Sequence, residues 1–198
     1  YVDFAVRGQG EETLLELLDA LFAGTPSLAA VAGLTWRRDS AIVHNARRIF
    51  SAASFVNSLP YERLGDPRRY LTRTYLGRRT SGYQAALGCR FRCTFCGVAA
   101  MFRGKTALPP AARLERDLDD LTGRLGVDSL LLYDNNFFDR EADTVPLLEV
   151  LAKRELPWWC FARADALVGL SASSWALVRR SRLRMAYIGA ESPSDWLL

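Results

Sequence analysis

Three cysteines lie close together, at Cys89, Cys93 and Cys96, in the stretch ALGCRFRCTFCGV. A structural zinc site would need a fourth thiolate or an imidazole at a comparable spacing, but the only histidine is His44 and the fourth cysteine is Cys160. A disulfide would use two of the three thiols and leave one over. The pattern therefore indicates an iron–sulfur cluster, and because such clusters normally take four thiolates, three would leave one iron open. An open position is typical of a catalytic metal centre.

Polar side chains also follow three apolar stretches further along the chain. Asp134, Asn135 and Asn136 come after SLLLY, Arg163 comes at the end of PWWCFAR, and Glu191 follows YIGA. In α/β barrels the reactive groups gather where the parallel strands end. We therefore expect these residues to face the same mouth as the cysteines.

The elements that must position these residues alternate between strand and helix from residue 80 onward. Hydrophobic periodicity predicts strands at 82–88, 128–135, 157–165 and 184–191, and helices at 110–126, 141–154 and 171–181. Strands separated by helices pair in parallel through right-handed crossovers. The predicted fold class is α/β, a partial (β/α) TIM-type barrel with the first four units, because a closed barrel needs about 250 residues.

The front of the chain has a different pattern. It predicts a short strand at 1–6, a helix at 12–24 with leucines three and four residues apart, a hairpin at 31–45, and an irregular linker at 46–78. The sequence does not begin with methionine, and we expect it to be a fragment of a larger protein.

Composition excludes several classes of protein. With 49% hydrophobic residues the chain can bury a core, and no apolar run approaches the roughly 20 residues of a membrane helix. The start has no signal-peptide pattern, and the cysteines are too crowded for a secreted disulfide scaffold, so a cytoplasmic location is expected. The net charge of +4 comes mainly from arginine pairs spread along the chain, a pattern more typical of solvated faces than of a nucleic-acid surface.

The stretch CRFRCTFC resembles the signature of the radical S-adenosylmethionine family, C-x3-C-x-aromatic-C. The resemblance implies that Cys89, Cys93 and Cys96 bind a [4Fe–4S] cluster whose fourth iron is chelated by S-adenosylmethionine. It also implies that Phe95 lies beside the adenine and that the reaction is reductive cleavage to a 5′-deoxyadenosyl radical. The implied partners are a small-molecule substrate and an electron donor of the flavodoxin or ferredoxin type. Three structural cysteines at this spacing by chance are the alternative.

The later strand ends fit the same resemblance. LYDNNFFDR resembles the family's second-strand segment but lacks its usual Gly-Gly-Glu. The resemblance therefore implies that Asp134 or Asn135 accepts a hydrogen bond from the methionyl amino group. The alternative is a strand cap that makes a turn. YIGAES resembles the Gly-x-Glu-Ser of members that also carry a cobalamin domain, which places Glu191 at the cofactor; otherwise it would be a capping or paired acid.

Arg163 alternates with Trp159 and Phe161, so the three should share one side of their strand. A guanidinium there needs an anion, which could be a cofactor or substrate carboxylate, or Asp134 or Glu191 in a structural ion pair. Cys160 is out of phase with this set and is predicted to be a buried hydrophobe on the helix side. For His44 we expect no chemistry.

The front segment, YVDFAVRGQGEETLLELLDAL followed by GLTWRRDSAIVHNARR and LPYERL, resembles the join between a cobalamin-binding domain and a radical S-adenosylmethionine barrel. The implied domains are a Rossmann-like cobalamin-domain remnant at 1–35, a hairpin and linker at 36–78, and a C-terminally truncated core at 79–198. Cobalamin would bind in the full-length protein.

Three functional hypotheses follow. The first is a cobalamin-dependent radical enzyme that transfers a methyl group to carbon. The second is a radical enzyme that catalyses cyclisation or rearrangement without methyl transfer. The third is a non-catalytic iron–sulfur module. The substrate contacts are expected mostly in strands beyond residue 198, so catalytic residues other than cofactor ligands are not assigned.

Overall fold

The structure is a computed structural model that describes residues 2–51, 60–194 and 196. The chain divides into two compact units. Among the described residues, unit 1 comprises 2–51 and 90–105, and unit 2 comprises 60–89, 106–194 and 196. The predicted linker at 46–78 includes residues 52–59, which lie outside the described residues.

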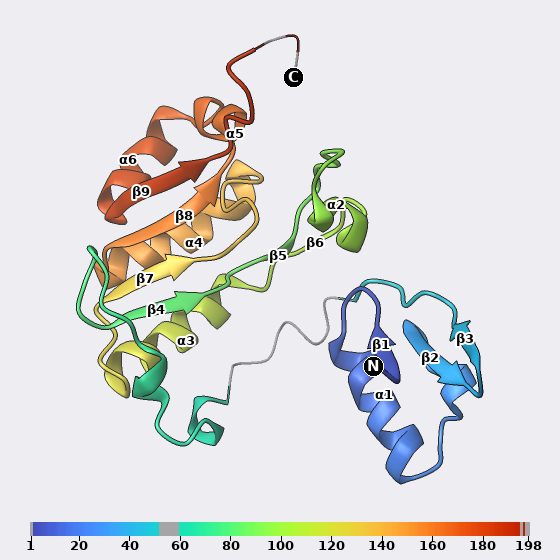
Figure 1. The fold of residues 1–198 in the computed structure, drawn as a ribbon. Helices are drawn as coiled ribbons and strands as arrows, with labels where there is room; N and C mark the ends of the chain where they lie inside the picture. The colour runs from blue at the N-terminus through green and yellow to red at the C-terminus, as the bar shows by residue number, and fades with distance from the viewer. Residues whose placement is uncertain (1, 52–59, 195, 197–198) are drawn as a thin grey trace. The chain divides into compact units, whose positions relative to one another are not determined.

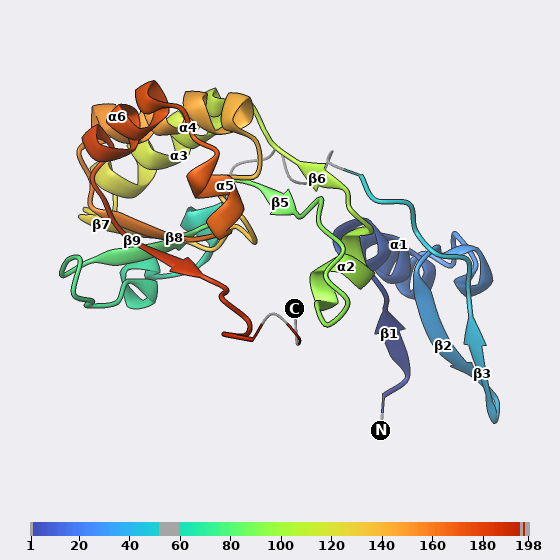
Figure 2. The ribbon, with the colours of Figure 1, turned by 90° about the horizontal axis from the view of Figure 1, so that it is seen from above.

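Unit 2 is built on a parallel sheet of four strands in the order β4-β7-β8-β9. The strands are β4 (Thr80–Tyr83), β7 (Ser129–Leu132), β8 (Trp158–Ala162) and β9 (Leu183–Ile188). The long helices of the unit, α3 (Ala111–Gly123), α4 (Glu141–Arg154) and α6 (Ala172–Arg180), lie together on one face of this sheet (Figures 1 and 2). The predicted alternation of parallel strands and crossover helices is confirmed.

The two-residue period of the strands decides which side chains meet the helices. In β8, Trp158 and Cys160 are fully buried in the core between sheet and helices, together with Leu132 of β7 and Leu118 of α3. Burial raises the pKa of the Cys160 thiol, so it stays protonated. The prediction that Cys160 is a buried hydrophobe is confirmed.

Local sequence sets the helix ends. Helix α4 begins with Glu141 and Asp143 in its first turn and ends with Lys153 and Arg154, an arrangement that complements the helix dipole. Helix α6 is capped by the Ser171 side chain, which accepts from the backbone N–H of Ser174. The short helix α5 (Ala164–Val168) starts directly after β8, so the strand predicted at 157–165 ends three residues early.

The strand predicted at 82–88 is divided into two pieces. After β4 the backbone bends, and β5 (Leu87–Gly88) pairs antiparallel with β6 (Thr106–Ala107) as a separate ribbon. The bend persists because the carboxylate of Asp134 accepts hydrogen bonds from the backbone N–H groups of Ala85 and Ala86, in place of a neighbouring strand.

Unit 1 holds an antiparallel sheet in the order β1-β2-β3, made of β1 (Phe4–Val6), β2 (Leu34–Arg38) and β3 (Ala41–His44). The β2–β3 pair confirms the predicted hairpin. A domain boundary was predicted at residue 35. This residue lies inside strand β2, where Leu34 and Thr35 both pair with β1. Helix α1 (Glu11–Phe22) buries Leu17 against Val31 and Leu34, and the segment of unit 1 that carries two of the cysteines contains α2 (Gly97–Phe102).

The remaining elements are short. Three 3₁₀ helices occur among the described residues, at η1 (Leu28–Ala30), η3 (Tyr61–Arg63) and η4 (Pro67–Tyr70). None of the helices in the described ranges is both long and apolar enough to cross a membrane.

Candidate functional site

The three cysteines follow the first parallel strand and its extension. Cys89 comes directly after β5 in unit 2, whereas Cys93 and Cys96 precede α2 in unit 1. The Cys96 N–H donates to the Cys93 carbonyl at 3.1 Å, and the Cys96 carbonyl accepts from Ala99 at 3.1 Å. Cys93 and Cys96 therefore lie on one backbone turn that leads into the helix.

The donor set fits an iron–sulfur cluster in type and accessibility. None of the three cysteines forms a disulfide within the described residues, and each is half-buried. Soft thiolates are the ligands that iron–sulfur clusters take. Within the described residues, no three histidine, cysteine, aspartate or glutamate side chains lie close enough together to hold a metal ion. The fit therefore depends on the chemical type of the three ligands and not on a preformed arrangement of their side chains.

Asp134 braces the backbone that leads to Cys89. Its carboxyl group is 1% exposed and accepts from the N–H groups of Ala85, at 3.3 Å, and of Ala86. Burial raises the pKa of Asp134 to about 6, although these two hydrogen bonds favour the charged form. Each carboxylate oxygen already accepts a backbone hydrogen bond, which is the strand-cap alternative considered for this residue.

The two asparagines after Asp134 connect further strand ends. The Asn135 amide donates to the carbonyl of Gly88, the residue before Cys89, at 3.2 Å. The Asn136 side chain is buried, and its Oδ1 accepts from the backbone N–H of Arg163 at 3.3 Å. Asn136 thus ties the end of β7 to the end of β8, a role that its place directly after a strand could have suggested.

Arg163 forms an ion pair with Asp165. Its Nε and Nη2 donate to the two carboxylate oxygens at 3.0 Å each, and this bidentate bond lowers the pKa of Asp165. Asp165 was not among the partners considered for Arg163, which were a cofactor or substrate carboxylate, Asp134 and Glu191. Asp165 pairs with Arg163 because Arg163 precedes α5 and Asp165 lies in the first turn of that helix, only two residues further along the chain.

Glu191 and Phe95 are both exposed. Glu191 has a φ of 58°, in the left-handed region, and its carboxylate folds back over Gly189, where it occupies the space that a Cβ would take. Phe95 is 71% exposed on the turn between Cys93 and Cys96. The proposed contacts of both residues with S-adenosylmethionine stay predictions.

An aromatic surface covers the sheet face opposite the helices, a feature that the sequence patterns did not fully indicate. Trp159 lies at its centre, with ring centroids 5.4 Å from Tyr133, 5.0 Å from Phe161 and 5.0 Å from Tyr187. Trp159 is 8% exposed, whereas the other three rings are open. Gly82 makes room for this set, because a Cβ there would lie 2.9 Å from the Tyr133 ring. The sequence signal for this surface was the alternation of side chains between the two faces of the strands in LLYD and WWCFA.

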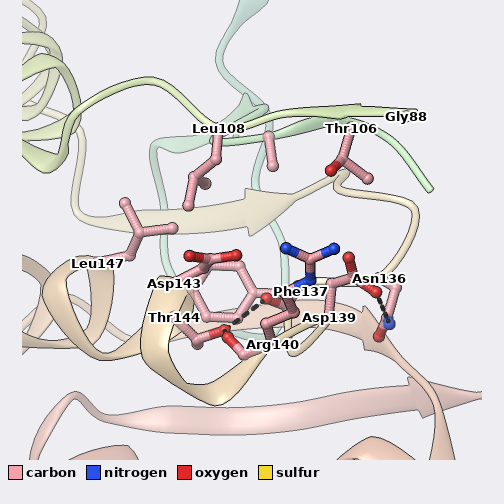
Figure 3. Close-up of a pocket in the computed structure, with 11 residues that line it drawn as sticks. Gly88, Thr106, Leu108, Asn136, Phe137, Asp139, Arg140, Asp143, Thr144 and Leu147 are labelled. Atoms are coloured by element: carbon pink, nitrogen blue, oxygen red, sulfur yellow. Dashed lines mark hydrogen bonds between the residues drawn. The ribbon is translucent and has the colours of Figure 1, made fainter. Parts of the chain in front are cut away.

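A small pocket lies between the β5–β6 ribbon and the start of α4 (Figure 3). Gly88 and Thr106 line it on the ribbon side, and Asn136, Asp139 and Arg140 line it on the helix side. Its cavity volume is about 30 Å³, which is enough for about one water molecule. It is too small for a cofactor.

The chain is similar in structure to several solved proteins. The chain matches the structure of the cobalamin-dependent S-adenosylmethionine radical enzyme OxsB, with aqua-cobalamin and S-adenosylmethionine bound, with a TM-score of 0.78 at 20% identity over 98% of this chain and 28% of that chain. The chain has the fold of the cobalamin-dependent radical S-adenosylmethionine enzymes. The predicted fold class and resemblance are confirmed.

Two structures of the radical S-adenosylmethionine methyltransferase TsrM from Kitasatospora setae agree. One holds tryptophan and aza-SAM and has a TM-score of 0.70; the other holds cobalamin and a [4Fe–4S] cluster and has a TM-score of 0.72. Both are 18% identical and cover 98% of this chain, and 38% and 39% of theirs.

Sequence similarity to a curated protein is partial. The chain is 32% identical over 100 residues to the anaerobic magnesium-protoporphyrin IX monomethyl ester cyclase of Synechocystis sp., over 48% of this chain and 18% of that protein. No family model matches the chain. The chain thus spans less than two fifths of the length of each of these relatives.

Proposed function

We propose that this protein is a radical S-adenosylmethionine enzyme. The observation that carries the proposal is the set of three cysteines at Cys89, Cys93 and Cys96, which follow the first parallel strand of this fold and form no disulfide within the described residues. When bound, the cluster and S-adenosylmethionine would supply reductive cleavage to a 5′-deoxyadenosyl radical.

The chain's own residues would take three parts in this reaction. The three thiolates hold the cluster, and Phe95, already exposed between two of them, packs beside the adenine. Asp134 acts as a positioning residue, because its oxygens hold the backbone before Cys89.

Polar groups at the other strand ends would orient S-adenosylmethionine. The side-chain oxygen of Asn135 and the exposed Glu191 carboxylate would accept hydrogen bonds from S-adenosylmethionine. Arg163, whose guanidinium is bound by Asp165, would face a carboxylate of the cofactor or the substrate. The aromatic surface around Trp159 would contact the substrate and exclude water from the radical.

Methyl transfer to carbon with cobalamin is the proposed reaction class, supported by the likeness to OxsB and TsrM over nearly the whole chain. Cyclisation is the second candidate, because the curated relative is a cyclase. S-adenosylhomocysteine separates the two: methyl transfer through a 5′-deoxyadenosyl radical releases methionine and 5′-deoxyadenosine from one S-adenosylmethionine and S-adenosylhomocysteine from a second. Radical cyclisation without methyl transfer releases methionine and 5′-deoxyadenosine but no S-adenosylhomocysteine.

Anaerobic reconstitution of the full-length protein with iron and sulfide tests the proposal. We expect S-adenosylmethionine to perturb the electron paramagnetic resonance signal of the cluster, and dithionite to yield 5′-deoxyadenosine. Cys93→Ala should lose the cluster, whereas Cys160→Ala, which removes a thiol from the core, should keep it. A full-length protein with neither perturbation nor product would contradict the proposal.

A further inference from the structure

The segment that carries Cys93 and Cys96 also forms one wall of a pocket within unit 1. The other wall is the connector after β3, and the lining that matters here is Arg47, Phe50, Met101, Phe102, Arg103 and Lys105. We call this surface the basic pocket. It shares no lining residue with the small pocket beside α4, which belongs to unit 2.

The basic pocket has an apolar floor and a cationic rim. Phe50 and Phe102 pack edge to face with ring centroids 5.5 Å apart, and Phe102 is 7% exposed. Arg47 donates to the carbonyl of Ala100 at 2.7 Å, at the end of α2, and thereby joins the two walls. An apolar centre surrounded by a polar rim in which arginine is enriched is typical of protein–protein interfaces.

Two cations of the rim have no acidic partner among the described residues. In the described part of the chain, neither Arg103 nor Lys105 has an ion pair with a carboxylate, whereas Arg48, which also lines the pocket, is bound by Glu12 and Glu16. Between Asp66 and Glu115 the sequence holds ten arginines and lysines and no acidic residue. This segment contains all three cysteines of the motif.

The basic pocket lies at the far end of the helix that begins at the motif. Cys96 is the N-cap residue of α2, and Met101 and Phe102 end it. Six helical residues span about 9 Å, so a partner seated on the pocket would lie close to Cys96.

We propose that the basic pocket docks an acidic, low-potential electron-transfer protein. This inference rests on the proposed function, because reductive cleavage of S-adenosylmethionine consumes one electron that must come from outside: the donor is oxidised by one electron, and the cluster is reduced by one. Such redox encounters are small and transient, and complementary charge gives them their association rate.

The geometry favours an acidic protein over a nucleic acid. Single-stranded nucleic acids are bound by cations together with open aromatic faces on which bases stack. Here Phe102 is 7% exposed and Phe50 is half-buried against it in an edge-to-face pair, so neither of these two rings is widely exposed for stacking. The cationic side chains also line a pocket, whereas a nucleic-acid surface would be expected to carry them in a continuous stripe.

Binding of an oxidised flavodoxin, measured by calorimetry with the cluster-loaded full-length protein and without S-adenosylmethionine, tests the surface. We expect binding that weakens at least tenfold between about 50 and 300 mM NaCl, because exposed charges are screened by salt. The variant Arg103→Gln/Lys105→Gln should weaken binding about tenfold at low salt, mainly through a slower association rate.

The matched control is Arg179→Gln/Arg180→Gln on α6, which removes the same net charge from exposed positions in unit 2. We expect it to change the affinity less than about threefold. Circular dichroism and the iron content of all variants check that fold and cluster are retained.

Three results would overturn the docking proposal: salt-independent binding, equal loss in both double variants, or a single-stranded RNA that binds through the basic pocket while flavodoxin does not. The two proposals fail separately. If dithionite drives cleavage but flavodoxin does not bind, only the docking surface is wrong. If flavodoxin binds through the pocket but no cleavage occurs, the surface stands and the enzyme assignment falls.

Discussion

Single buried polar residues hold the strand ends in place, and Asp134 is the strongest case. Its carboxyl pKa is about 6 in the folded chain, against 3.8 as the ordinary value, because burial disfavours the charge. The folded state therefore binds this proton more tightly than the unfolded state does. Its contribution to stability is fully present below about pH 4 and is lost as the pH rises through about 6.

We therefore expect the free energy of unfolding to fall by up to about 3 kcal/mol from pH 4 to pH 7 through this group. Asp134→Asn, which cannot ionise, should remove that part of the pH dependence in urea titrations. Asp165→Asn is the control, because the pKa of Asp165 is lowered and lies below this window. Equal pH profiles for Asp134→Asn and the unaltered chain would refute the assignment.

Tyr83 anchors β4 to α3 through a buried hydrogen bond. Its hydroxyl donates to Asp117 at 2.6 Å, and the Arg113 guanidinium lies 3.4 Å from the same oxygen. Tyr83→Phe should lower the free energy of unfolding by about 1.5–3 kcal/mol, because the bond involves a charged acceptor in the core. Tyr187→Phe, on the open aromatic surface, should change it by less than about 0.5 kcal/mol. Similar effects for both variants would show that the bond contributes little.

At the scale of elements, α4 carries a defect that its sequence makes visible. Pro146 lies inside the helix and is exposed, so the carbonyl one turn earlier, at Ala142, lacks its helical donor. Pro146→Ala should raise the free energy of unfolding by about 1 kcal/mol or more. Pro110→Ala, at the N-cap of α3 where no such bond is lost, is the comparison and should be near neutral. Thermal unfolding measures both, and a destabilised Pro146→Ala would contradict this account.

The bend between β4 and β5 shows where element prediction stops. The residues at 82–88, GYQAALG, contain no charged residue and no proline that would mark an end at Tyr83. The break is made by a carboxylate 48 positions away in sequence, Asp134 to Ala86, so no window along the chain contains its cause. Helix α4, whose charges and periodicity are local, was predicted with its observed bounds.

At the scale of the whole molecule, the two units have very unequal cores. Unit 1 buries Leu17, Val31 and Leu34, whereas the core of unit 2 runs through all four parallel strands and the three long helices. Most leucines of α1, such as Leu15 and Leu18, are exposed. Stability against local opening depends on buried apolar contacts, so unit 1 should open more readily.

Hydrogen exchange measured by mass spectrometry tests this difference. Backbone amides of β2 and β3 should exchange at least about tenfold faster than those of β7 and β8, because less buried apolar surface opposes their opening. Equal protection of the two sheets would mean that unit 1 is stabilised by interactions other than its own core.

The sequence alone determined the features whose causes are local. The spacing of Cys89, Cys93 and Cys96 predicts a set of thiolate ligands. The periods of two and 3.6 residues identified the parallel strands, the helices and the position of Cys160 on the helix side. These patterns depend on residues within a few positions of one another.

Only the tertiary structure decided which polar groups are already engaged. It assigned Asp134 to the backbone before Cys89, Asn136 to the end of β8, and the rim charges of the basic pocket to one hollow. A hydrogen bond or a concave surface depends on atoms brought together from distant parts of the chain, and spacing along the sequence does not record that distance. The physical reason is that burial, which makes these contacts necessary, is a property of the folded chain.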